Sequence, residues 1–221
     1  SYAAYTELRL PLIAGGQTDA PERLAMSLAL RADQSDRYDD TGITDTIGLE
    51  FRPASTVLLR ASYNSAFKPL SIYAAFRPLE STSGALVFDP QINNYTIVTA
   101  FSGGGIPDGI KPETSTSRTL GMVWTPQFLP GLQVSLTGWD SRLRDRIPTG
   151  GPQFFIDNEA FFPDHVIRTP GGLLSQVTVT PVNIARTDMA GVDLGLSWTL
   201  QTRYGAFFPT LAATWTNQFD V

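Results

Sequence analysis

The sequence predicts an all-β protein: an antiparallel up-and-down transmembrane β-barrel, of which this chain would supply about eight strands. Three observations predict this fold. Apolar residues alternate with small or polar residues along many segments, with the period of two that a strand gives. The connections between these segments are alternately short and long. Only 17% of the 221 residues are charged although 42% are hydrophobic, whereas about a quarter of a typical soluble domain is charged.

Composition excludes several other classes of protein. The chain has 16 Lys and Arg against 21 Asp and Glu, a net charge of -5 with no basic run, so we expect no nucleic-acid partner. Its apolar stretches are shorter than the roughly 18 residues of a transmembrane helix, and no segment has a convincing helical pattern. The absence of cysteine excludes disulfides and thiolate metal sites.

Four expected strands lie in the first part of the chain. They occupy residues 2–12, 24–31, 46–52 and 57–64, and each of the last three alternates strictly. One face of these three strands is apolar, and it consists of Leu24, Met26, Leu28, Leu30, Ile47, Leu49, Phe51, Val57, Leu59, Ala61 and Tyr63.

Four more strands are expected in the second half, at residues 119–125, 132–137, 191–199 and 210–216. The opposite face of these strands consists mainly of glycine, alanine, serine and threonine. Their apolar positions are Leu120, Met122, Trp124, Leu132, Val134, Leu136, Val192, Leu194, Leu196, Trp198, Leu211, Ala213 and Trp215.

The connections indicate how these strands are assembled. Residues 13–22, 53–55, 126–130 and 200–205 form short connections, whereas the connections between them include two long ones, 65–113 and 144–182. In an up-and-down sheet alternate connections lie at opposite ends, so one end would carry short turns and the other long loops. Outer-membrane barrels have this asymmetry. A soluble β-sandwich would show the same periodicity, but the loop asymmetry favours the barrel.

The two strand faces and the aromatic residues agree with a barrel in lipid. A lipid-facing surface tolerates few charges, whereas a hydrated lumen accepts residues such as Glu50 and Arg60. Aromatic side chains concentrate at membrane interfaces. We therefore expect an interfacial girdle near the strand ends on the apolar face, formed by Tyr63, Trp124, Trp198, Phe207 and Trp215.

Several segments in order resemble one family. Residues 110–124 read IKPETSTSRTLGMVW, and residues 183–198 read NIARTDMAGVDLGLSW. Upstream, residues 47–53 read IGLEFRP and residues 58–70 read LLRASYNSAFKPL. Together these segments resemble TonB-dependent outer-membrane receptors in their order and spacing. Lys68 stands where that family has an arginine.

The resemblance implies a fold and a function. Members of the family form a 22-stranded outer-membrane barrel with an N-terminal plug, bind a ferric siderophore, haem, cobalamin or a glycan, and import it with TonB energy. Residues 1–221 would be a barrel segment without the plug. The implied partners are outer-membrane lipid of a Gram-negative bacterium, the TonB complex through the plug and its TonB box, and a small nutrient. No enzymatic activity and no cofactor are expected.

The two long connections would lie outside the cell, where aromatic residues could contact a ligand. The competing interpretation is that these residues pack the loops against one another. The aromatic candidates for ligand binding are Phe76, Phe88, Tyr95, Phe101, Phe154, Phe155, Phe161 and Phe162.

Other candidate sites are weaker. His165 is the single histidine, so we expect no metal site there, and no Gly-x-Ser-x-Gly turn supports a Ser-His-Asp hydrolase with Asp164. The acidic run in one hairpin lacks the spacing of a calcium loop. That run comprises Asp33, Asp36, Asp39, Asp40 and Asp45, and a charged group at one strand end comprises Arg142, Arg144, Asp145 and Arg146.

The charged group at the strand end would reach lipid headgroups or attract an anionic ligand. Two other identities remain open from the residues alone. One is a complete small outer-membrane barrel that acts as an adhesin or structural protein. The other is a soluble β-sandwich that acts as a binding module.

Overall fold

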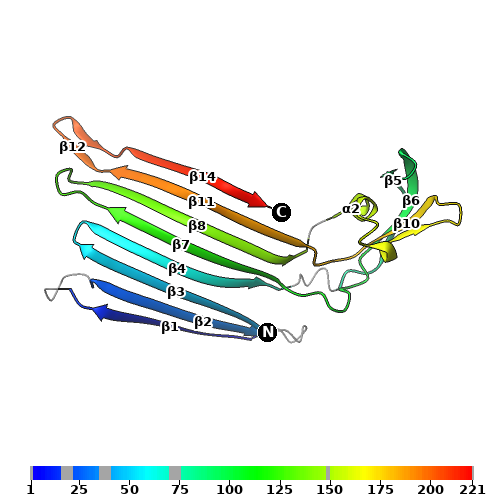
Figure 1. Cartoon of the computed structure of the whole chain (residues 1–221), viewed down its shortest axis with the longest axis horizontal. Helices are drawn as coiled ribbons and strands as arrows, with labels where there is room; N and C mark the ends of the chain where they lie inside the picture. Colours follow the sequence, from blue (N-terminus) through cyan, green and yellow to red (C-terminus); the bar gives the residue numbers. More distant parts are fainter. Residues whose placement is uncertain (1, 16–21, 35–40, 70–75, 148–149, 221) are drawn as a thin grey trace. The chain divides into compact units, whose positions relative to one another are not determined.

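A computed structural model describes residues 2–15, 22–34, 41–69, 76–147 and 150–220 (Figure 1). The chain divides into two compact units. The sheet unit comprises Ser1–Lys68, Thr114–Arg144 and Arg186–Val221. The insert unit comprises Pro69–Glu113 and Asp145–Ala185.

The sheet unit contains one eight-stranded sheet in the order β1-β2-β3-β4-β7-β8-β11-β14. This confirms the predicted eight strands and their up-and-down order. The residues expected to form the last short turn instead form a small hairpin of β12 (Leu200–Thr202) and β13 (Gly205–Phe207). The eight strands are β1 (Tyr2–Ile13), β2 (Leu24–Gln34), β3 (Thr41–Ala54), β4 (Val57–Lys68), β7 (Glu113–Trp124), β8 (Leu132–Arg146), β11 (Ala185–Trp198) and β14 (Thr210–Asp220).

The sheet is open in the part of the chain that the structure describes. Strand β1 pairs with β2 and strand β14 pairs with β11, and these two strands form its edges. A complete eight-stranded barrel would pair β1 with β14, so that alternative is wrong. The β-sandwich alternative is also wrong, because all eight strands belong to one sheet rather than to two stacked sheets.

The strand register sorts side chains onto two faces as the alternation predicts. Leu8 lies opposite Leu28, Leu28 lies opposite Ile47, and Met122 lies opposite Leu136. Directly opposed residues share a face, and this apolar face leaves large side chains exposed, Leu120 by 70%. Soluble monomers rarely expose a continuous apolar surface of this kind. The apolar face comprises Leu8, Leu28, Leu30, Ile47, Leu49, Phe51, Leu120, Met122, Leu136, Val192, Leu194 and Leu211.

The opposite face is polar, and its side chains bond to one another across strands. The Ser62 and Thr119 hydroxyl oxygens are 2.7 Å apart, and Arg60 Nη2 donates to Thr137 Oγ1 at 3.2 Å. Arg9 forms ion pairs with Glu22 at 3.0 Å and Glu50 at 3.3 Å. These contacts satisfy polar groups on one face, while the other face carries the large apolar side chains, which is the arrangement of a membrane barrel wall.

The two connections that were expected to be long loops contain regular secondary structure and fold together into the insert unit. A second sheet has the order β5-β6-β10-β9, in which β6 and β10 are parallel. Short helices also form, although no helical pattern was expected. The elements are β5 (Glu80–Asp89), β6 (Asn94–Ser102), α2 (Pro152–Asp157), the 3-10 helix η1 (Pro163–His165), β9 (Val166–Arg168) and β10 (Leu174–Val179).

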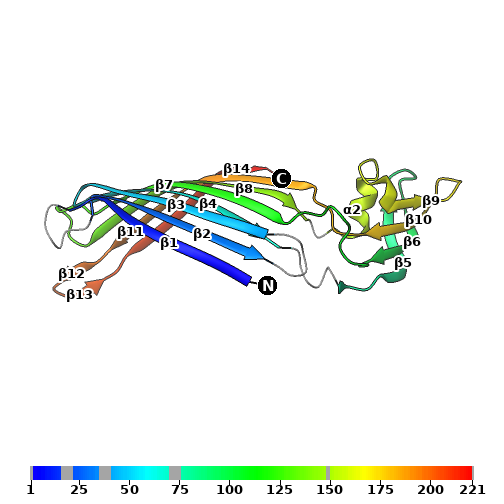
Figure 2. The same ribbon diagram turned by 90° about the horizontal axis from the view of Figure 1, so that it is seen from below.

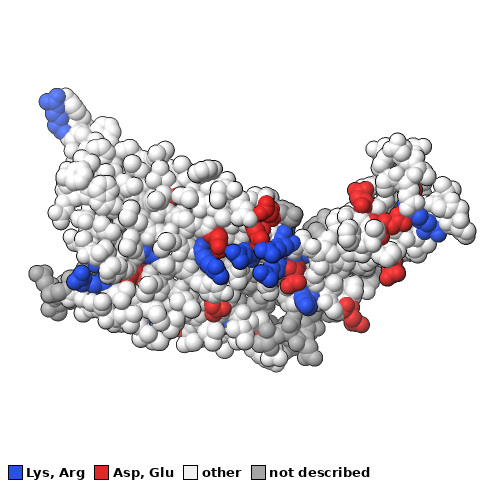
Figure 3. Space-filling model, viewed as in Figure 1, with Lys and Arg blue, Asp and Glu red and all other residues white. Residues whose placement is uncertain are grey.

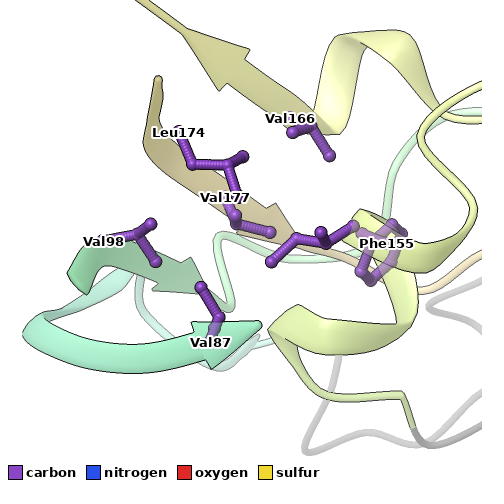
Figure 4. Close-up of a cluster of buried hydrophobic side chains, with 7 residues drawn as sticks. Val87, Val98, Phe155, Val166, Leu174 and Val177 are labelled. Carbon is purple, nitrogen blue, oxygen red and sulfur yellow. The ribbon is translucent and has the colours of Figure 1, made fainter. Parts of the chain in front are cut away.

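Helix α2 packs against strands β5 and β10 of the insert sheet, and Figure 2 draws it beside them. Phe155 and Ile156 on α2 are buried against Val87, Val98 and Val177, shown in part in Figure 4. Val177 is fully buried. The insert unit therefore has its own hydrophobic core. No helix in the described ranges is long and apolar enough to cross a membrane.

Candidate functional site

The outer face of the insert sheet is an exposed apolar surface. Residues on β5 and β6 alternate between the core and this face: Val87 and Val98 are buried, whereas Leu86 and Ile97 are each 68% exposed. Leu86 and Ile97 oppose each other in the β5–β6 register. A hairpin with two apolar faces is typical of a surface that contacts a ligand or partner.

Three aromatic residues predicted to bind ligand belong to this outer face. Phe88 and Tyr95 oppose each other in the register, and their rings meet edge to face with centroids 5.5 Å apart. Phe101 has the same parity as Tyr95 and Ile97 on β6, and it is half-buried. We name the set Leu86, Phe88, Tyr95, Ile97 and Phe101 the outer aromatic face.

Three other aromatic candidates pack inside the insert unit. Phe155 is 2% exposed and belongs to the core, so a ligand has no access to its ring there. Phe154 and Phe162 pack against that core and contact Phe155 with ring centroids 5.3 Å and 5.5 Å away. For these three residues the structure agrees with the packing interpretation. The remaining two candidates, Phe76 and Phe161, are 62% and 81% exposed.

A buried ion cluster joins β5 to β9. Arg168 Nη1 and Nη2 donate to the two Asp89 carboxylate oxygens at 2.9 Å and 3.0 Å, and Arg168 also bonds to Glu159 at 2.7 Å. The Asp89 side chain is fully buried. The Arg168 guanidinium holds the pKa of Asp89 below its usual value, mainly through these hydrogen bonds, against the opposing effect of burial. Glu159 and Asp89 together raise the pKa of Arg168.

An asparagine side chain connects three chain segments of the insert unit, and sequence reasoning did not assign it a role. Asn183 Oδ1 accepts a hydrogen bond from the Lys111 backbone N–H at 2.7 Å. Its Nδ2 donates to the carbonyl oxygens of Lys111 at 2.9 Å and Asp145 at 2.6 Å. Both Lys111 and Asn183 lie in the segments that resemble the receptor family. Those family-like segments were the available signal, since Lys111 lies in one of them and Asn183 begins another.

The weaker candidate sites have structural contacts of their own. The His165 ring stacks on Phe155 at 4.6 Å, and its Nδ1 lies 2.9 Å from the Thr178 carbonyl oxygen. Asp33 pairs with Arg31, and the Asp45 carboxylate accepts a hydrogen bond from Ser65.

The other members of the acidic run, Asp36, Asp39 and Asp40, lie outside the described residues. Within the described ranges, no three His, Cys, Asp or Glu side chains group to hold a metal ion.

The predicted interfacial aromatics are only partly at strand ends. Trp124, Trp198 and Phe207 are the last residues of β7, β11 and β13. Tyr63 and Trp215 instead lie within β4 and β14, so their expected place near a strand end was wrong. Trp215 opposes Val192 and is 73% exposed, so it remains on the apolar face. The interfacial role of all five residues stays a prediction.

Comparison with solved structures identifies the same architecture. A mutant of the ferric enterobactin receptor PfeA from Pseudomonas aeruginosa matches with a TM-score of 0.65 and 16% identity, over 96% of this chain and 26% of that one. The siderophore receptor PirA from Acinetobacter baumannii matches with a TM-score of 0.64 and 17% identity, over 97% of this chain and 27% of that one. At these identities the likeness shows the fold. The chain therefore spans about a quarter of these two proteins.

A family model covers the entire chain. The model described as TonB dependent receptor-like, beta-barrel, matches residues 1–221. No curated protein matches the chain. The matched family consists of receptors and transporters of the Gram-negative outer membrane rather than of enzymes. The sheet order, the two strand faces and this match lead to one conclusion: the chain belongs to the TonB-dependent receptor family and forms part of its β-barrel.

Proposed function

We propose that this chain is part of an outer-membrane receptor that binds a scarce nutrient and imports it with energy supplied by TonB. The observation that carries the proposal is the match of the receptor barrel family to the whole chain. Two features of the molecule support it. The sheet unit has one extended apolar face, and the insert unit has an exposed aromatic face.

The apolar face would contact lipid, and the polar face would line the lumen. The eight strands contain 11 to 15 residues each, and about 9 to 11 residues suffice for a tilted strand to cross the hydrocarbon layer. The polar side chains of the lumen face find partners on neighbouring strands, as between Ser62 and Thr119. A sheet of this kind can span lipid only when its edges are paired, so further strands would complete the barrel.

The insert unit would lie outside the cell and contact the nutrient through its outer aromatic face. Aromatic rings supply a large apolar contact area at a low entropy cost. The structurally similar PfeA is a ferric enterobactin receptor and PirA is a siderophore receptor. A ferric siderophore is therefore the nutrient class that we propose, and ferric enterobactin is the first compound to test.

A binding titration tests the outer aromatic face. In the full-length receptor, Phe88→Ala with Tyr95→Ala should weaken the binding of ferric enterobactin at least about tenfold, as expected when central aromatic contacts are removed. Phe208→Ala is the matched control, because Phe208 is also an exposed phenylalanine but belongs to the sheet unit. Unchanged affinity in the double variant would rule out this face as the binding surface.

An uptake experiment tests the energy source separately. Cells that carry the receptor should accumulate labelled ferric siderophore when TonB is present and lose accumulation when TonB is deleted. Binding at the cell surface should remain in both strains. Equal accumulation in the two strains would contradict TonB coupling, whatever the ligand.

A further inference from the structure

The apolar face of the sheet unit changes to charged residues along three neighbouring strands. On β7 the alternating run Leu120, Met122 and Trp124 is preceded by Arg118. On β8 the run that includes Leu136 is followed by three charged residues, and on β11 the run that includes Val192 is preceded by two more. All are at even-numbered positions and so share the apolar face. We name Arg118, Asp140, Arg142, Arg144, Arg186 and Asp188 the charged band.

The charged band is continuous across the strands. Arg118 opposes Asp140 in the β7–β8 register. Arg142 lies 3.9 Å from Asp140. Arg142 and Arg144 both interact electrostatically with Asp188 on β11. In Figure 3, Lys, Arg, Asp and Glu atoms gather over the middle strands of the sheet unit, and broad uncharged areas surround them.

Positive charge remains in excess between β7 and β8. Arg118 opposes Asp140, whereas Arg142 and Arg144 oppose Thr116 and Thr114, so this face of the β7–β8 pair carries three arginines and one carboxylate. Among the described residues, no carboxylate lies within ion-pair distance of Arg118 or Arg144. On β11, Arg186 and Asp188 form an ion pair of 2.6 Å, and Asp220 on β14 lies opposite Asp188 in the register.

The position of these arginines on the sheet indicates what kind of ligand they can bind. The Arg118 guanidinium lies over the Tyr63 ring at 6.0 Å, and Arg142 and Arg144 are exposed. A charged side chain on a lipid-facing strand costs about 2 to 4 kcal/mol at the bilayer midplane and close to nothing near the interface. Arg142 and Arg144 lie near the end of β8 and so fit the level of the headgroups, whereas Arg118 lies nearer the middle of β7 and would extend its long side chain toward that level. Arginine binds phosphate through paired, charge-assisted hydrogen bonds.

We propose that Arg118, Arg142 and Arg144 bind the phosphorylated headgroup of a membrane lipid on the outward face of the barrel. The apolar residues directly beside the band, Leu120 and Leu136, would contact the acyl chains of the same lipid. This neighbouring apolar surface favours a lipid over a free phosphate ion. The inference rests on the proposed membrane location, but it is independent of which nutrient is imported.

Lipid titration of the full-length receptor in detergent tests the site. The probe is bisphosphorylated lipid A, and bound lipid is counted by native mass spectrometry. Each arginine near a membrane surface contributes about fivefold to anionic lipid binding, so Arg142→Gln with Arg144→Gln should weaken binding about 25-fold. Arg31→Gln with Arg203→Gln is the matched control, since it removes the same charge from exposed arginines outside the band.

Three further arms keep the outcomes distinct. Arg142→Lys with Arg144→Lys retains the charge but loses the paired hydrogen bonds, so it should weaken binding less than the glutamine pair does, which separates lost charge from lost folding. Dephosphorylated lipid A should bind weakly to the unaltered receptor. Equal weakening in the control pair, or displacement of lipid A by inorganic phosphate at equal concentration, would overturn the proposal. Ferric enterobactin binding to the same variants should be unchanged, so failure of the nutrient proposal is separable from failure of this one.

Discussion

Asp89 retains its charge inside the insert unit because Arg168 donates hydrogen bonds to both of its carboxylate oxygens. Arg168→Met would leave a buried carboxylate without its cation. Removing one partner of a buried ion pair lowers the free energy of unfolding by about 3 to 5 kcal/mol. The insert unit should then open more often, so backbone amide hydrogen exchange should accelerate in β5, β6 and β9. Lys111→Met is the control, since it removes an exposed cation from the same unit. Equal exchange in the two variants would show that the ion cluster is not needed for stability.

The same pair predicts how the insert unit responds to acid. The pKa of Asp89 is lower in the folded unit than its ordinary value of about 3.9. A carboxyl group with a lowered pKa stabilises the fold at pH values above its ordinary pKa. This stabilisation disappears as the pH falls toward the lowered pKa of the folded state. Pepsin should therefore cleave the insert unit more readily as pH falls below about 4. Asp89→Asn should lose this pH dependence, and a persistent dependence would assign it to other groups.

Asn183 provides another test at single-residue level. Its side chain makes three hydrogen bonds to backbone groups of Lys111 and Asp145. Asn183→Ala would remove them and cost about 3 kcal/mol if each contributes about 1 kcal/mol. The Lys111 amide should then exchange much faster. Asn94→Ala removes a single local bond to the Tyr95 amide and should leave the Lys111 amide protected; protection that survives in Asn183→Ala would contradict the assigned role.

Among the elements, the strands of the large sheet could be predicted because each has one apolar face and one polar face. The period-two pattern therefore identified seven of the eight, and the first strand was expected at residues 2–12. Strand β5 was missed because its first half is polar and its second half is apolar on both faces: Val87 points to the core while Leu86 and Phe88 lie on the outer face. An unbroken apolar run does not reveal which side is buried. Helix α2 has six residues, too few to display a helical period.

The candidate site was predictable only in part, for a related reason. The sequence identified eight aromatic residues in the two long connections, but it could not separate those on a surface from those in a core. That separation depends on the pairing of β6 with β10, which joins segments about 75 residues apart. It places Phe155 inside and Tyr95 outside.

The turn between β7 and β8 depends on a glycine in contact with a neighbouring connection. Gly131 has a φ of +82°, and an added Cβ would lie 2.4 Å from the Thr199 carbonyl oxygen. Gly131→Ala would therefore incur both the left-handed backbone cost of about 1 kcal/mol and a steric clash. Gly172→Ala is a matched control, because Gly172 has the same φ of +82° and no atom within 4 Å of the added Cβ.

The measurement is the fraction of full-length receptor that folds into detergent micelles, followed by circular dichroism. Gly131→Ala should fold less completely than Gly172→Ala. The Trp198 indole N–H donates to the Pro130 carbonyl oxygen at 3.2 Å, so a displaced turn should also change tryptophan fluorescence. Identical folded fractions and spectra for the two variants would show that the turn accommodates the added methyl group without loss of stability.

At the scale of the whole molecule, the sheet unit has two features that promote aggregation in water. Its apolar face is exposed, and its edge strands β1 and β14 each pair on one side in the described structure. Unpaired edges and exposed apolar surface both promote association between chains. Lipid and neighbouring strands would remove both, which agrees with membership in a barrel family.

This predicts how residues 1–221 behave when produced alone. The segment should sediment as large aggregates in buffer and disperse only in detergent. Leu120→Glu with Leu211→Glu places two charges on the apolar face and should reduce the detergent requirement, whereas Gln133→Glu with Thr216→Glu places the same charges on the polar face and should not. Analytical ultracentrifugation with and without detergent measures the difference. A monodisperse, β-rich monomer in plain buffer would contradict the assignment of the apolar face to lipid, because the apolar face would then remain exposed to water without association between chains.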